Sequence, residues 1–283
     1  MLPPGALPYT YWTVLDGTTT LTDGGVIEES LLSLYLNGQE LATLMCSPID
    51  QEALALGFLY NEGVIQSRDE VRHLHANVAR TVIDVFLTHA DFEPRRRMVL
   101  TSGCGGGITL QNLTETYPAL ETDFTCAPQV IFDRMRDLQG AAHLYNSVRG
   151  VHTAILADPD RLLLSAEDVG RHNTIDKLAG KALQSGLDTR QHIILTSGRI
   201  SSEMLNKARR MGVPLVASRT APTSLAVQLA RAWNICVVGY VRRGRMQVYT
   251  QPERLGLEAM APLPQGRHNA PSLREIEDEQ DDA

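Results

Sequence analysis

A glycine-rich loop around one cysteine is the first stretch of this sequence that could carry chemistry. Residues 99–108 read Val-Leu-Thr-Ser-Gly-Cys-Gly-Gly-Gly-Ile, so four glycines surround Cys104. Glycine packs no side chain and costs backbone entropy, so this composition indicates a loop that leaves the sulfur unshielded. Two interpretations follow: the loop presents a nucleophilic thiol to a partner, or it is a plain glycine turn with an incidental cysteine.

Polar turns between predicted strands and helices form a second group of candidates. Their charged, hydroxyl and glycine residues are Glu167, Asp168, Arg171, His172, Ser197, Gly198, Arg199 and Arg219. Ligands of α/β proteins bind beyond the carboxyl ends of the strands, and a helix N-terminus favours an anion. The turns therefore predict a phosphate or carboxylate site at one sheet edge. The alternative is that they hold helix caps and surface arginines, with Asp168 as a cap and His172 half-buried.

An arginine-rich link between two predicted strands is the third candidate. Its residues are Tyr240, Val241, Arg242, Arg243, Gly244 and Arg245. Guanidinium groups pair with phosphates in a bidentate manner, and a glycine lets a ligand approach the backbone. The link is therefore predicted to bind phosphate, unless it is only a solvated hairpin tip.

The elements that must position these residues alternate along the chain. Strands are expected over residues 11–15, 31–36, 39–45, 81–87, 153–157, 162–165, 192–195, 213–217, 236–241 and 246–249. Helices are expected after Ser47 as N-cap, over residues 128–148, from near His172 with Gly186 after its end, over 201–211 and over 224–233. This alternation predicts an α/β layered domain with a parallel or mixed sheet. Residues 1–10, with three prolines, are expected to be poorly ordered.

Composition narrows the class of protein. The chain has 283 residues and a net charge of -7, but six acids (Glu275, Glu277, Asp278, Glu279, Asp281 and Asp282) lie at the C-terminus, so the body is nearly neutral. The sequence has no signal peptide and no long apolar run, which predicts a cytoplasmic protein with reduced thiols and no membrane partner. The four cysteines are widely spaced and form no CxxC pair, which argues against a structural metal site. No nucleic-acid partner is expected. A zinc deaminase is excluded because its His-x-Glu and Pro-Cys-x-x-Cys motifs are missing.

Several motifs in fixed order resemble one known family. These are Tyr60-Asn-Glu-Gly63, the Cys104 loop, Glu167-Asp-Val-Gly-Arg-His-Asn173, Thr196-Ser-Gly-Arg199, residues 218–225 and residues 239–245, which together resemble the FdhD family of formate dehydrogenase accessory sulfurtransferases. The resemblance implies a cytidine-deaminase-like α/β domain over residues 101–257 and a smaller N-terminal α+β domain over residues 8–100. Beyond them, the prolines and the acidic run of residues 258–283 predict a disordered tail. It hints at a homodimer.

The same resemblance implies a function. Cys104 would carry sulfur as a persulfide from a cysteine desulfurase to a molybdenum or tungsten bis-guanine-dinucleotide cofactor needed by formate dehydrogenase. Tyr240–Arg245 would bind this cofactor, with Arg171, His172, Ser197, Gly198 and Arg199 beside it, and GDP would be a partial mimic. One departure is that Gly107 stands where two-cysteine members have a second cysteine. The alternative function is a cofactor-binding chaperone without sulfur chemistry.

Overall fold

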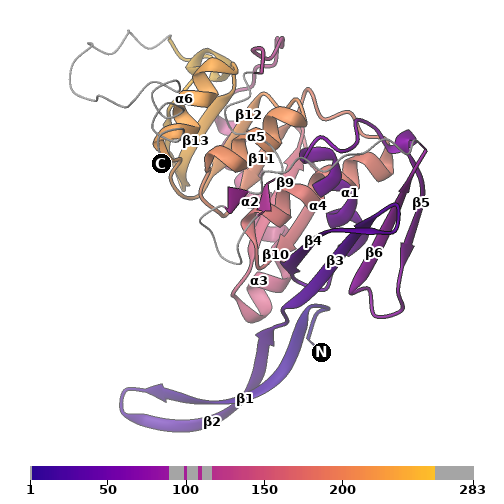
Figure 1. The fold of residues 1–283 in the computed structure, drawn as a ribbon. Coiled ribbons are helices and arrows are strands. Elements are labelled where there is room, and N and C mark those ends of the chain that lie inside the picture. Colours follow the sequence, from indigo (N-terminus) through magenta and orange to yellow (C-terminus); the bar gives the residue numbers. More distant parts are fainter. Residues whose placement is uncertain (1, 89–98, 101–107, 110–116, 259–283) are drawn as a thin grey trace, which may run out of the picture.

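The computed structural model describes residues 2–88, 99–100, 108–109 and 117–258, and these form two sheet-centred parts with a projecting hairpin (Figure 1). The smaller part is a four-stranded sheet in the order β4 (Gln39–Cys46), β3 (Ser30–Leu36), β6 (Val82–Leu87) and β5 (Val71–Ala76). Asn37 and Gly38 have φ of 51° and 79°, which is the left-handed backbone that a tight β3–β4 turn needs. Alternate residues of β3, namely Leu32, Leu34 and Leu36, are buried against helix α1 (Gln51–Asn61).

The larger part is a six-stranded mixed sheet. Its order is β10 (Leu162–Asp168), β9 (His152–Ala157), β11 (Ile193–Thr196), β12 (Leu215–Ser218), β13 (Cys236–Arg242) and β14 (Arg245–Val248). The central strands β11, β12 and β13 are parallel, whereas β9, β10 and β14 pair antiparallel with their neighbours. The α/β layered class expected from the sequence, with a smaller α+β part before it, is confirmed.

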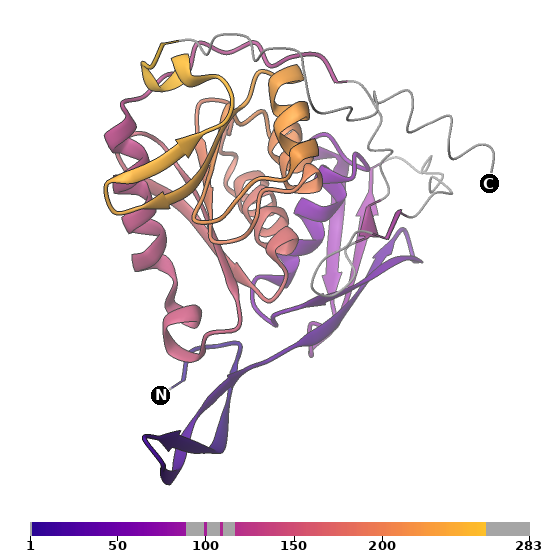
Figure 2. The same ribbon diagram turned by 90° about the vertical axis from the view of Figure 1, so that its left-hand side faces the viewer.

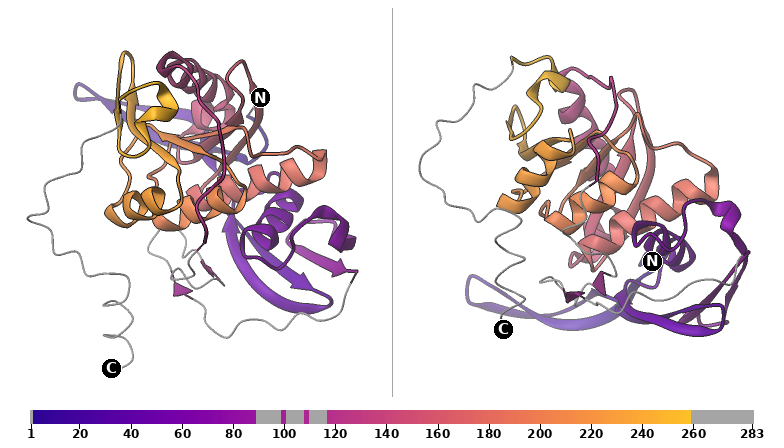
Figure 3. Two further views of the ribbon diagram at one scale, coloured as in Figure 1. Left: turned by 90° about the horizontal axis from the view of Figure 1, so that it is seen from above. Right: turned by 45° about the horizontal axis from the view of Figure 1, so that its top comes forward.

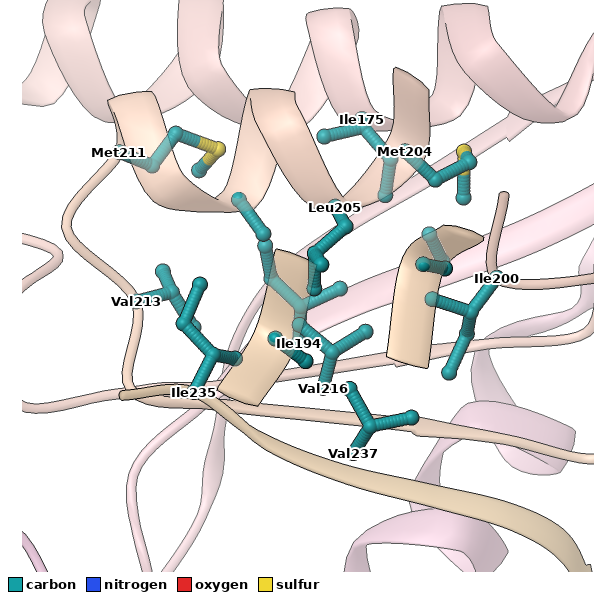
Figure 4. Close-up of a cluster of buried hydrophobic side chains, with 14 of the residues drawn as sticks. Ile175, Ile194, Ile200, Met204, Leu205, Met211, Val213, Val216, Ile235 and Val237 are labelled. Carbon is teal, nitrogen blue, oxygen red and sulfur yellow. The ribbon is translucent and has the colours of Figure 1, made fainter. Parts of the chain in front are cut away.

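Helices cover both faces of this sheet (Figure 2). One face packs on α4 (Arg171–Ser185), α5 (Ser202–Arg210) and α6 (Ser224–Ala232), and the other packs on α2 (Pro128–Ala141), which is followed by the short α3 (His143–Val148). Because successive strand residues point to opposite faces, Ile194 joins the first core while Ile193 and Leu195 join the second. In Figure 4 the helix residues Ile175, Met204 and Leu205 lie over the strand residues Ile194, Val216 and Val237.

Helices α1 and α4 join the two parts by crossing at very short range (Figure 3). A Cβ atom on Gly57 would overlap the backbone carbonyl of Asp176, and one on Gly180 would overlap the backbone carbonyl of Ala53. Glycine at both positions is therefore what allows the two helix backbones to touch.

Several local predictions were wrong. Helix α1 begins at Gln51 after Asp50, whose φ of 54° is left-handed, and Ser47 caps no helix because its hydroxyl and N–H contact the turn after β10. Residues 6–10 belong to strand β1 (Ala6–Leu15), and the expected helix over residues 128–148 breaks at Ala142. Strands β2 (Thr18–Ile27) and β5 were not predicted, and the structure also has short 3-10 turns at Arg68–Glu70 and Pro252–Leu255.

Candidate anion-binding site at the carboxyl edge of the sheet

The polar turns singled out in the sequence meet at one edge of the six-stranded sheet. Thr196 at the end of β11 pairs with Ser218 at the end of β12, and β13 ends beside them at Arg242. Asp168 at the end of β10 pairs with His152, which opens the antiparallel strand β9 at the same edge. The predicted convergence of the turns is therefore a property of this fold, and it adds His152, which the sequence analysis did not select.

Hydrogen bonds hold three of the turns together. The Ser218 hydroxyl donates to the Gly198 carbonyl at 2.6 Å, and the Thr220 N–H donates to the Ser218 oxygen at 2.9 Å. The Tyr240 N–H then donates to the Thr220 carbonyl at 2.9 Å, and the Arg242 guanidinium donates to the Arg219 carbonyl. The turns thus form a connected rim rather than independent loops.

The turn at Ser197 and Gly198 has little room. The Ser197 oxygen accepts from the Thr153 N–H at 3.0 Å and lies 3.3 Å from Nδ1 of His152. A Cβ atom on Gly198 would lie 2.9 Å from Cβ of Arg171. Glycine is therefore required there for the buried Arg171 to pass beneath the turn, while the neighbouring Arg199 stays exposed.

Two cavities open along this rim and share Gln139, Arg219 and Arg242. The smaller, of about 290 Å³, is bordered by His152, Ser197 and Thr220 on the sheet side. The larger, of about 710 Å³, lies between the Val241–Gly244 link and the side chains of Phe132, Met135 and Arg136 on α2. Guanidinium groups at a shared wall and apolar side chains in the larger cavity suit a ligand that has both a phosphate and a flat ring.

The structure separates the residues predicted for this site. Val241, Arg242, Arg243 and Gly244 line the larger cavity, and Ser197 lines the smaller one. Neither cavity is lined by Tyr240, Arg245 or Arg199. Tyr240 is 41% exposed and has a left-handed φ of 52°. The cavity residues on α2, which include Gln139, belong to no recognisable sequence motif. Only the packing of α2 on the sheet identifies them.

His172 belongs to a buried polar network next to the site. Its Nε2 lies 3.3 Å from the Ser201 hydroxyl and its Nδ1 lies 3.4 Å from Glu203. Burial, and then the charge of Lys207, lowers the pKa of His172 to about 2, so the ring is neutral. Lys207 itself is fully enclosed, yet Asp176 at 2.6 Å and Glu203 keep its pKa above the ordinary value despite the opposing effect of burial. His172 is therefore an uncharged member of this network.

Glu167 and Asp168 also have structural partners. Glu167 accepts from the N–H groups of Leu144 and Tyr145 at 2.8 and 2.9 Å, which fixes the start of α3. Asp168 pairs with the buried Lys177 and accepts from the Ser47 N–H, so it tethers the N-terminal sheet. The turn after β10 thus supports the site and does not line it.

The cysteines divide into two groups. Cys46 and Cys236 are fully buried, and burial raises the pKa of each thiol to about 12; burial also raises the pKa of the half-buried Cys126 to about 11. None of the three has an accessible thiolate at neutral pH. Cys104 lies outside the described residues, but strands β7 (Val99–Leu100) and β8 (Ile108–Thr109) pair antiparallel, so the two ends of its loop lie side by side.

Comparison with known proteins decides the family. A sequence model of the FdhD/NarQ family matches residues 27–256. The chain belongs to the FdhD/NarQ family. It is 37% identical to the sulfur carrier protein FdhD of Bacillus subtilis (strain 168) over 86% of this chain and 95% of that protein. It is 36% identical to the sulfur carrier protein FdhD of Staphylococcus aureus (strain MRSA252), over 85% of this chain and 92% of that protein.

A solved structure supports this membership in the FdhD/NarQ family. It is the crystal structure of a protein assigned as a formate dehydrogenase accessory protein from Desulfotalea psychrophila, with a TM-score of 0.77 and 28% identity, covering 89% of this chain and all of that one. Within the described residues, no helix is long and apolar enough to cross a membrane. The same residues contain no group of three His, Cys, Asp or Glu side chains placed to hold a metal ion.

Proposed function

We propose that this FdhD/NarQ protein is a sulfurtransferase that carries sulfur on Cys104; the relatives named above are called sulfur carrier proteins. The supporting observation is the state of the other cysteines. The attacking species in sulfur exchange is the thiolate, and burial suppresses it at Cys46, Cys126 and Cys236. Cys104, in its glycine loop, is the remaining thiol.

In the proposed loading step, the Cys104 thiolate attacks the terminal sulfur of a persulfide on a cysteine desulfurase. A new sulfur–sulfur bond forms on Cys104, the old one breaks, and the desulfurase cysteine leaves as its thiolate. The step has no net oxidation or reduction. Because Gly107 replaces the second cysteine of two-cysteine members, Cys104 alone receives and holds the sulfur.

The proposed acceptor is a molybdenum or tungsten bis-guanine-dinucleotide cofactor, bound as cargo on its way to a formate dehydrogenase in the cytoplasm. The two cavities favour such a ligand, because Arg219 and Arg242 on their shared wall suit phosphate, while Phe132 and Met135 offer apolar contact to a ring. Ser197 and the Val241–Gly244 link would hold the nucleotide end, and Arg171, His172 and Gly198 would keep the rim in shape.

The test is intact-mass and peptide mass spectrometry after incubation with a cysteine desulfurase and cysteine. Wild type and Cys126→Ala, which serves as the matched control, should gain one sulfur of about 32 Da on the peptide with Cys104, whereas Cys104→Ala should gain none. A persulfide that maps only to Cys46, Cys126 or Cys236 would refute the assignment. Nucleotide binding by a wild type that never loads sulfur would favour the chaperone alternative.

A further inference from the structure

A groove runs along the open edge of the N-terminal sheet. Strand β5 is the last strand in the order β4-β3-β6-β5, and in the described part of the chain no strand pairs with the side of β5 that faces away from β6. A cavity of about 700 Å³ is lined by every residue from Arg72 to Val78 and by no residue of β6, so it lies along that open side. Glu52 and Leu56 of α1 and Gln184 of α4 also line it. The groove is thus bounded by a strand edge and two helices.

Backbone groups of β5 point into this groove. The Asn77 N–H donates to the Val82 carbonyl at 3.1 Å, so the backbone of Asn77 faces β6. The hydrogen-bonding side alternates along a strand, so His75 also faces β6, whereas the N–H and C=O groups of Leu74 and Ala76 face the groove. Strand β5 contains no proline that would remove one of these donors. An open edge of this kind is a template for a further strand.

The side chains give the groove a positive charge. Arg68, Arg72 and Arg80 line it, against the single lining carboxylate of Glu52. Arg80 and Glu52 are 3.9 Å apart with side chains 61% and 41% exposed, so solvent screens this pair. Arg68 and Arg72 donate to backbone carbonyls, which carry no net charge. The groove therefore attracts an acidic ligand.

Charge and backbone together select the kind of ligand. Charged side chains guard many open strand edges against pairing, and in this groove most of them have the same sign. A second β5 edge would place arginines opposite arginines, and like charges directly opposite each other destabilise a sheet. A nucleic acid has the complementary charge, but its backbone has no amide groups to pair with a strand. An acidic polypeptide in an extended conformation satisfies both the charges and the backbone groups.

We propose that the β5 groove docks an extended acidic segment of a partner protein, which adds to β5 as a further strand. The N–H and C=O groups of this segment pair with those of Leu74 and Ala76, a mode of binding in which the backbone gives affinity and alternate side chains give specificity. Its carboxylates meet Arg72 and Arg80, and apolar side chains between them contact the fully exposed Val78. Figure 1 shows β5 at the other side of the molecule from β13, so a partner bound here leaves the candidate anion-binding site uncovered.

The test is fluorescence anisotropy of the full chain with a labelled octapeptide of alternating Glu and Val, which is long enough to span residues 72–78. Wild type should bind it with a dissociation constant of about 100 µM or lower. Arg72→Glu/Arg80→Glu should raise this constant at least about tenfold, because both charges are reversed. Arg161→Glu/Arg231→Glu makes the same change of charge at exposed positions outside the groove and should bind like wild type.

Two further measurements separate strand pairing from simple attraction of charge. An octapeptide of alternating Glu and Pro keeps the carboxylates but lacks half of the N–H groups, so wild type should bind it at least about tenfold more weakly. Ala76→Pro removes an N–H that faces the groove, which an edge strand tolerates, and should lose the Glu-Val peptide while its melting temperature stays near that of wild type. The comparison of the two peptides decides the question even if this variant unfolds.

Three results would overturn the proposal. The first is the absence of saturable binding of the Glu-Val peptide by wild type up to about 1 mM. The second is equal affinity for the Glu-Val and Glu-Pro peptides, because the groove would then recognise charge alone. The third is an oligothymidylate that binds more tightly than the peptide and loses affinity in Arg72→Glu/Arg80→Glu, because the groove would then serve a nucleic acid.

Discussion

Nζ of Lys177 on α4 lies 2.6 Å from Oδ2 of Asp168 at the end of β10, and both side chains are completely buried. The same Asp168 carboxylate accepts from the Ser47 N–H, and Lys177 also donates to the Ser47 carbonyl at 3.4 Å. This ion pair therefore joins the turn beneath the candidate site to the chain that leaves the N-terminal sheet.

Removal of one partner should be costly. Lys177→Met leaves a buried carboxylate without its counter-charge, so we expect the free energy of unfolding to fall by about 3–5 kcal/mol. Arg190→Met breaks a pair with Asp188 of equal length, 2.6 Å, in which the side chains are 76% and 59% exposed, so solvent screens this pair and the loss should be far smaller than for Lys177→Met. Urea unfolding of both variants checks this, and equal losses would contradict it.

The helix crossing gives a second prediction. Gly180→Ala should destabilise the protein by several kcal/mol or prevent folding, because the new methyl group overlaps the Ala53 carbonyl of α1. Gly140→Ala, also within a helix but with nothing within 4 Å of the new methyl group, should stabilise it by about 0.5–1 kcal/mol. Thermal unfolding of the two variants should shift in opposite directions, and a tolerated Gly180→Ala would show that α1 and α4 can separate.

The buried histidine predicts a dependence of stability on pH. The folded pKa of His172 is about 2, and an unfolded histidine has a pKa of about 6.5. Between these values the unfolded chain binds a proton that the folded chain does not, so stability is lost as the pH falls below about 6.5. The loss from this residue should reach about 2 kcal/mol at pH 5.

His172→Gln should remove that part of the pH dependence. Urea unfolding at pH 7.5 and pH 5 measures this effect. Between the two pH values, the free energy of unfolding of the variant should fall by about 2 kcal/mol less than that of wild type. His143→Gln removes an exposed histidine at the start of α3 and serves as the control. If His172→Gln loses as much stability between the two pH values as wild type, His172 is not the group responsible.

Nucleotide binding should depend on the shared wall of the two cavities. Charge-assisted hydrogen bonds contribute roughly 1.5–3 kcal/mol each, so Arg219→Ala/Arg242→Ala should weaken GDP binding by about a hundredfold or more in calorimetry at fixed salt. Arg231→Ala, an exposed arginine at the end of α6, should bind GDP like wild type. Unchanged affinity in the folded double variant would move the site away from this wall. Persulfide loading on Cys104 should survive in either case.

The sequence alone determined the elements with strong local signals. Alternating apolar residues and the Asn37-Gly38 turn specified β3 and β4, and strand–helix alternation after residue 150 specified the α/β class. The polar turns could also be placed at one sheet edge, because the carboxyl ends of parallel strands meet there. The Asp16-Gly17 turn was a signal for the β1–β2 hairpin that the three prolines of residues 1–10 obscured.

The tertiary structure decided what each polar residue does. Ser47 has the composition of a helix cap, yet long-range bonds to Asp168 and Val169 draw it away from α1. His172 and Asp168 resemble ligand-binding residues in a short motif, but burial beside Lys207 keeps His172 neutral within a polar network, and Asp168 forms a buried ion pair with Lys177. His152 and Gln139 reach the site only because an antiparallel strand and a distant helix pack there. Local patterns record backbone preference, whereas burial and charge pairing depend on side chains from different elements that only the fold brings together.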